Sequence, residues 1–151
     1  MVPGRGGGGG RRRYEVVGTT ADVAIRAFGE SHRELFTNAA YGMADLICDT
    51  TTVHPKVARE VVASAPTPER LMVAWLTELL VLFEGEGMVF ATFEVEVMPA
   101  PPEGKWALRA IVRGEPYEHG RHQILHDVKA VTYHTLVVDP EKGVAMVLFD
   151  I

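Results

Sequence analysis

The sequence contains very little cysteine. Its single cysteine, Cys48, excludes an internal disulfide framework and a zinc site built from cysteines alone. One cysteine in 151 residues is compatible with a reducing compartment but does not establish one. We interpret Cys48 as a small hydrophobic side chain that is buried or partly buried.

The sequence also lacks a long hydrophobic run. No uninterrupted apolar stretch approaches the roughly 20 residues of a membrane-spanning helix, and the first residues lack the apolar segment of a secretory signal. With 47% hydrophobic residues, the chain is long enough to form one domain with a substantial core. These features predict a soluble cytoplasmic protein.

Motifs for covalent and phosphate-binding chemistry are missing as well. No glycine-rich loop ends in Gly-Lys-Ser/Thr, and no serine occupies a nucleophile elbow. Catalysis through a covalent nucleophile is therefore not expected.

Three histidines have a spacing that suggests zinc. His119, His122 and His126 lie in a segment that contains glycine, and neither a cysteine nor an obvious fourth ligand is nearby in the sequence. A glycine-containing connection does not ensure the helical geometry that would bring the rings together. We therefore interpret these histidines as structural or solvent-exposed.

Charge is distributed unevenly along the chain. Residues 1–13 contain a run of five glycines, four of the 15 lysines and arginines, and none of the 20 acidic residues, which leaves residues 14–151 with a formal net charge of −9. We predict a disordered Gly/Arg-rich tail over residues 1–13 and a single domain over residues 14–151. An acidic domain repels phosphate backbones and suits a basic protein partner, so RNA is expected to be contacted only indirectly.

Periodicity and capping signals predict an α+β fold. One helix is expected to begin at the capping box Ser31–Glu34, and another at Thr67-Pro68 with Gly85 placed to end it. Alternating patterns predict strands over residues 14–18, 23–28, 57–65, 87–98, 105–113 and 144–149, and one or two strands within 125–138. We expect two layers, a mostly antiparallel sheet with both main helices on one face, and possibly a duplicated strand-helix-strand-strand module.

Three carboxyl groups at strand ends form the candidate site. Asp22 stands at the beginning of the second strand, and Asp150 and the free carboxylate of Ile151 follow the last strand. If neighbouring strands bring them together, the three groups repel strongly unless a cation neutralises them. Ligands that are all oxygen select a hard ion, calcium or magnesium. The alternative for Asp22 is a structural turn residue that accepts hydrogen bonds from nearby backbone N–H groups.

Short segments in chain order resemble the archease family. They run from Tyr14 to the last residue and are Tyr14-Glu15, Thr20–Val23, Arg26–Gly29, Glu34–Phe36, Asn38–Ala40, Trp75-Leu76, Glu78–Leu80, Val128–His134 and Phe149–Ile151. Their common order along the chain makes the resemblance specific.

The resemblance implies a non-catalytic activator of the GTP-dependent tRNA-splicing RNA ligase. Archeases promote guanylylation of that ligase and allow it to turn over repeatedly, without joining RNA themselves. The metal-binding positions of the family fall on Asp22, Asp150 and Ile151, with calcium as the implied ion, and its functional lysine falls on Lys129. A lysine at the edge of an acidic site can pair with a carboxylate or a phosphate oxygen; without the resemblance, Lys129 is simply a charge at a strand edge.

The sequence departs from the family at two positions. The family usually has a histidine where this chain has Thr19, and an asparagine where it has Thr77. Without an imidazole at Thr19, either that position is not an obligatory ligand or the ion is bound more weakly.

Two other functions remain open. The chain could be a chaperone, or a modulator of a tRNA-modifying enzyme such as a tRNA methyltransferase, that works through an exposed apolar surface. It could also be a metal-dependent hydrolase, although the sequence offers no convincing general base beside the carboxylates.

Overall fold

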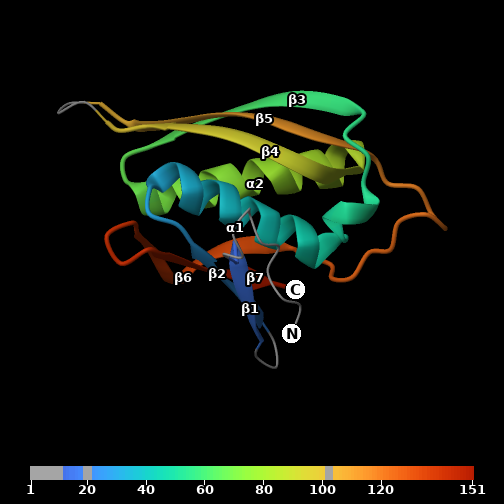
Figure 1. Cartoon of the computed structure of the whole chain (residues 1–151), viewed down its shortest axis with the longest axis horizontal. Coiled ribbons are helices and arrows are strands. Elements are labelled where there is room, and N and C mark those ends of the chain that lie inside the picture. Colours follow the sequence, from blue (N-terminus) through green and yellow to red (C-terminus); the bar gives the residue numbers. More distant parts are fainter. Residues whose placement is uncertain (1–11, 19–21, 101–103) are drawn as a thin grey trace.

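The computed structural model describes residues 12–18, 22–100 and 104–151 (Figure 1). Most of the predicted tail, residues 1–11, lies outside the described part. The described residues form two α-helices, one short 3-10 helix and seven strands: β1 (Tyr14–Gly18), β2 (Asp22–Phe28), α1 (His32–Ile47), η2 (Thr50–Thr52), β3 (Val57–Ala65), α2 (Pro68–Glu86), β4 (Met88–Met98), β5 (Trp106–Pro116), β6 (Ala130–Asp139) and β7 (Val144–Asp150). None of these helices is long and apolar enough to cross a membrane.

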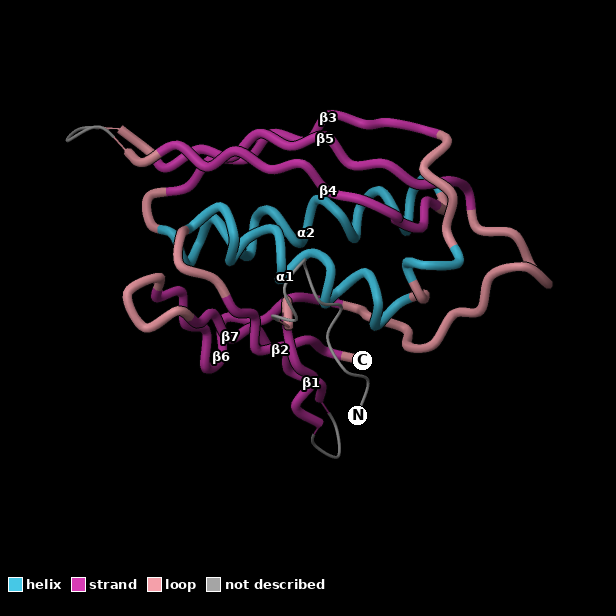
Figure 2. The backbone as a smooth tube through the Cα atoms, in the orientation of Figure 1, coloured by secondary structure: helices cyan, strands magenta, loops and turns pink. Residues whose placement is uncertain are grey.

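The strands form two antiparallel sheets with the helices between them. One sheet has the order β1-β2-β7-β6 and the other has the order β3-β5-β4. Figures 1 and 2 show α1 and α2 side by side in the space that separates the sheets. Helix α1 packs against β2 and β4, and helix α2 packs against β3 and β6.

The predicted α+β class, antiparallel pairing and two main helices are confirmed. The number of layers differs from the prediction, because the strands divide between two sheets and the molecule has three layers instead of two. Neighbouring residues of α1 show the reason: the Tyr41 ring packs on Phe93 of β4, with 5.0 Å between ring centroids, whereas Gly42 lies against Ile25 of β2. A helix that is apolar on two sides can bury both only between two sheets. The possible duplication stays a prediction.

Both predicted helix starts are confirmed. The Ser31 hydroxyl accepts a hydrogen bond from the Glu34 N–H at 3.1 Å, and the Thr67 hydroxyl accepts one from the Arg70 N–H at 3.2 Å. The predicted end of α2 at Gly85 is wrong. The helix continues to Glu86, and Gly87 ends it in the left-handed conformation, with φ of 67°.

The predicted strands at 14–18 and 57–65 have the observed bounds, and β2, β4 and β7 each differ from the prediction by one residue at one end. The bounds of β5 and β6 differ more. Strand β5 runs on to Pro116, past a bulge in β4 between Phe90 and Thr92. Gly114 lies so close to β4 that a Cβ there would be 1.9 Å from the Val89 carbonyl oxygen. Strand β6 begins only at Ala130, because the preceding residues form an irregular segment held by side-chain bonds described below.

The core lies between the layers and is centred on α2. Trp75 is completely buried, and its indole N–H donates to the Phe36 carbonyl of α1 at 3.0 Å. Cys48 is buried in the same core, as predicted.

Arg13, which precedes β1, contacts the folded domain. The Phe28 N–H donates to the Arg13 carbonyl at 2.9 Å, and the Arg13 guanidinium lies 3.9 Å from the centroid of the Tyr41 ring. Arg13 therefore belongs to the packed structure and not to the tail.

Candidate carboxylate site

The pairing of β2 with β7 brings together two of the predicted ligands. In this antiparallel pair Asp22 lies directly opposite Asp150, although the two residues come from opposite ends of the chain. On the other side of β7, Asp150 pairs with Ala130 of β6, and its carbonyl accepts a hydrogen bond from the Lys129 N–H at 2.8 Å. Three segments distant in sequence therefore meet at one end of the four-stranded sheet.

Alternation along the strands places both carboxylates on the same face. Val23 and Phe149, which follow and precede the two aspartates, are buried on the helix side of the sheet. Asp22 and Asp150 therefore face away from the helices, where Asp22 is partly exposed and Asp150 exposed. Directly opposite residues in an antiparallel pair have Cβ atoms about 5 Å apart, so one ion can lie within reach of both side chains.

The donor chemistry of this end of the sheet fits a hard cation. Two carboxylates directly opposite each other repel, and a cation between them removes that repulsion. Within the described ranges, no cluster of three or more histidine, cysteine, aspartate or glutamate side chains is suited to hold an ion. A complete coordination shell would therefore draw on main-chain oxygens, such as those of Ile151, and on water.

The remaining predicted positions are placed as follows. The Lys129 side chain is exposed, next to the strand that carries Asp150. Thr19 lies outside the described residues. Thr77 is exposed on α2 and is not part of the β2–β7 pair.

Only one of the three histidines is buried. His119 and His126 are exposed, whereas His122 is only 4% exposed. The His122 Nδ1 atom accepts from the Glu118 N–H at 2.9 Å, and its Nε2 atom lies 3.0 Å from Glu115 Oε2. Both nitrogens are thus engaged in hydrogen bonds within the protein, which agrees with the interpretation of these residues as structural or exposed.

Glu115 is the buried centre of an ionic cluster that the sequence did not reveal. Its carboxylate is 2% exposed, accepts two bonds from the Arg121 guanidinium at 2.6 and 2.9 Å, and accepts a third from the His54 N–H at 2.7 Å. These contacts, with Arg121 the strongest, lower the pKa of Glu115 to about 2 despite its burial. The cluster holds the first part of the irregular segment between β5 and β6, which leads on to Lys129.

Asp45 is a buried acidic residue near the C-terminal end of α1, and only 7% of it is exposed. The Tyr14 hydroxyl donates to one of its carboxylate oxygens at 2.6 Å, and the Thr50 N–H donates to the other at 2.8 Å. Asp45 therefore links β1 to the turn after α1 and serves the fold.

The whole domain is similar to known proteins. The model of the archease protein family (MTH1598/TM1083) matches residues 14–151. Protein archease from Methanosarcina mazei is 39% identical over 132 residues, which cover 87% of this chain and 90% of that protein. Protein archease from Methanosarcina acetivorans is 40% identical over 128 residues, which cover 85% and 87%. The solution structure of Methanobacterium thermoautotrophicum protein 1598 has a TM-score of 0.77 and 29% identity, covering 92% of this chain and 99% of that one.

Proposed function

This chain belongs to the archease family, and we propose that it is an accessory protein that activates the GTP-dependent tRNA-splicing RNA ligase. It promotes guanylylation of the ligase and supports repeated turnover, without catalysing RNA joining itself. The observation that supports this proposal best is the direct pairing of Asp22 with Asp150, two positions to which the family resemblance assigns metal binding.

In this proposal Asp22, Asp150 and a main-chain oxygen of Ile151 hold a divalent cation, with calcium as the first choice. Oxygen ligands suit this ion, and the exposure of Asp150 leaves room for water or for a group of the partner. When bound, the ion supplies positive charge that can neutralise carboxylate or phosphate oxygens. The two aspartates position this charge on a rigid pair of strands, which favours precise docking.

Lys129 is proposed to act at the contact with the ligase. Its main chain is fixed to Asp150, so its charged side chain starts from a defined point beside the acidic pair. An ammonium group there can pair with a carboxylate of the partner or with a phosphate oxygen of bound nucleotide. The ion pair between buried Glu115 and exposed Arg121 holds the first part of the segment that leads to Lys129.

The proposal is tested by measuring formation of the covalent ligase–GMP intermediate from radiolabelled GTP. We expect the wild type to accelerate it, and Asp22→Asn, Asp150→Asn and Lys129→Ala to lose most of that acceleration. Glu141→Gln is a matched control, because Glu141 is an exposed acid in the turn at the other end of β7. Equal stimulation by wild type and both aspartate variants would exclude the proposed mechanism.

A chaperone, or a modulator of a tRNA-modifying enzyme, would require an apolar docking surface. The exposed large apolar side chains of the described residues are divided among β3, α2, β4, β6, the β5–β6 connection and the chain end. Exposed apolar residues that occur singly are normal on a protein surface. This distribution favours the ligase proposal over the chaperone.

A further inference from the structure

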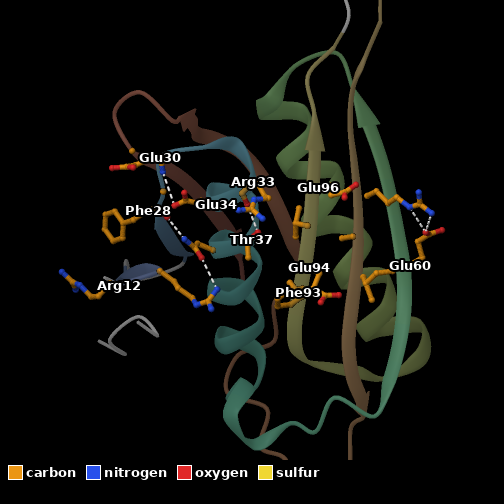
Figure 3. Close-up of a pocket in the computed structure, with 18 residues that line it drawn as sticks. Arg12, Phe28, Glu30, Arg33, Glu34, Thr37, Glu60, Phe93, Glu94 and Glu96 are labelled. Carbon is orange, nitrogen blue, oxygen red and sulfur yellow. Dashed lines mark hydrogen bonds and ion pairs between the residues drawn. The ribbon is translucent and has the colours of Figure 1, made fainter. Parts of the chain in front are cut away.

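A large groove runs along the side of the molecule between α1 and the edge strand β4. It has a volume of about 1200 Å³ and opens to solvent (Figure 3). Its floor includes Arg33, Thr37 and Asn38 of α1, and its wall is formed by β4 around Phe93 and Val95. A space of this size can hold an extended peptide of several residues.

The groove is separate from the carboxylate site. Phe28 and Gly143, which line it, lie at the end of the β2–β7 pair opposite to Asp22 and Asp150. The seven residues of β2 place the two ends about 20 Å apart. A ligand in the groove would therefore not reach the carboxylate pair directly.

Strand β4 offers an unpaired edge to this groove. Among the described strands β4 pairs only with β5, and the Phe93 N–H donates to the Tyr41 hydroxyl of α1 at 3.4 Å. Because backbone groups alternate between the two sides of a strand, the N–H and C=O groups of Val95 and Val97 also face away from β5. Open strand edges accept an additional strand, and a groove beside the edge gives that strand room.

The charges beside this edge exclude one occupant and favour another. Glu94 and Glu96 are exposed on the outer face of the sheet. If a second copy of β4 paired antiparallel about Val95, each of these carboxylates would face a carboxylate of the other copy, which is unfavourable. An incoming strand with basic side chains at alternate positions would instead bring them beside Glu94 and Glu96 on the outer face. Its other side chains would face α1, where Arg12, Arg13 and Arg33 line the groove and disfavour a second row of basic side chains. Glu94 already pairs with Arg113 at 2.7 Å, whereas Glu96 has no ion-pair partner among the described residues.

We propose that the edge of β4 over residues 93–97 binds an extended segment of a partner protein that carries lysine or arginine at alternate positions. The segment adds a fourth strand to the β3-β5-β4 sheet and fills the groove above α1. The formal charge of −9 on residues 14–151 adds a long-range attraction for such a segment. This surface goes beyond the proposed function and does not rest on the carboxylate site.

The first test uses nuclear magnetic resonance of the full ¹⁵N-labelled chain. The probe is a synthetic peptide of about seven residues in which lysine and valine alternate. We expect saturable shifts of the Val95 and Val97 amide signals and of α1 signals from Arg33 to Asn38. Two control peptides are N-methylated at every lysine or at every valine. One of them must lose binding, because only one set of N–H groups can face β4.

Variants of β4 then test the assignment. Val95→Pro removes an N–H on the open side and should weaken binding at least tenfold, and proline is tolerated at such edge positions. Because Val95→Pro could still disturb the strand, Glu96→Lys provides a second variant that leaves the backbone unchanged. It should weaken binding about fivefold at low salt and favour a peptide in which glutamate replaces lysine. Glu141→Lys is the control for net charge and should have little effect.

Three outcomes would overturn the proposal. The first is the absence of saturable shifts at peptide concentrations up to about 1 mM. A dissociation constant above this value would be far weaker than typical specific recognition. The second is binding that neither Val95→Pro nor Glu96→Lys changes. The third is a concentration-dependent dimer in sedimentation experiments whose dissociation shifts the Val95 and Val97 signals, since that would assign the edge to a second copy.

Discussion

Asp22 lies directly opposite Asp150 across the antiparallel pair of β2 and β7, and both carboxylates point away from the helices. Pairs of this kind are unfavourable in a sheet unless something offsets the repulsion. The buried neighbours Val23 and Phe149 hold the register, because a shift by one residue would turn them out of the core. The core therefore enforces the approach of the two charges.

Calcium is expected to stabilise the protein through this pair. At a hundred times its dissociation constant, the ion should add about 2.7 kcal/mol to the free energy of unfolding. Asp150→Asn should abolish this gain. Without calcium, the same variant should be more stable than wild type by about 0.5 kcal/mol, because the cross-strand repulsion is removed. Thermal unfolding with and without calcium chloride measures both effects.

Asp22→Asn and Glu141→Gln complete that experiment. Asp22→Asn should also lose the response to calcium, whereas Glu141→Gln, in the turn before β7, should keep it. A calcium response that survives in both aspartate variants would show that any bound ion lies elsewhere.

Glu115→Gln should destabilise the fold by about 2 kcal/mol, because it removes the charge that pairs with Arg121. Urea unfolding at neutral pH measures this loss. Glu118→Gln is the matched control: Glu118 also contacts Arg121, at 3.1 Å, but its side chain is 64% exposed. Exposed ion pairs contribute little, so we expect the control to change stability by less than about 0.5 kcal/mol.

The same carboxylate should make stability sensitive to acid. Its pKa is about 2 in the folded protein, against about 4.3 for an unfolded glutamate. Its contribution is therefore complete above about pH 4.5 and is lost as the pH falls towards 2. The difference in unfolding free energy between wild type and Glu115→Gln should shrink over this range, as followed by urea unfolding at several pH values. A difference that stays constant from pH 6 to pH 2 would contradict the assignment.

Replacing Gly114 or Gly85 by alanine should change the stability of the protein in opposite directions. Gly114→Ala should cost about 3 kcal/mol or more, because its Cβ would lie 1.9 Å from the Val89 carbonyl oxygen in the backbone of β4. Gly85→Ala should instead stabilise the protein by about 0.5–1 kcal/mol, since Gly85 lies within α2 and a Cβ there meets nothing within 4 Å. Denaturant unfolding of both variants tests the pair, and similar effects of the two would contradict it.

Features set by neighbouring residues could be predicted from the sequence. The capping hydroxyls of Ser31 and Thr67 act within one helical turn, so their motifs located both helix starts. The end of α2 was harder, because Gly85 and Gly87 both suit a helix end and only the position of β4 decides between them. Local signals therefore identified the elements better than their ends.

Long-range relationships could be predicted only in part. Their places at strand ends made the meeting of Asp22 with Asp150 one possible arrangement, and the β2–β7 register places the two residues opposite each other. The metal site itself stays a prediction. The division into two sheets could not be read from periodicity, since alternation along a strand does not reveal which strand lies beside it. Burial of Glu115 was missed for a similar reason, because Arg121 reaches it through an irregular segment with no periodic pattern.

The four-stranded sheet takes β1 and β2 from the beginning of the described chain and β6 and β7 from its last part. During synthesis one edge of β2 therefore stays uncovered until β7 has left the ribosome. Contacts between such distant segments slow folding and leave apolar strands open to aggregation. A nascent chain arrested before β7 would lack the acidic pair, so the pair can form only once β7 has been synthesised.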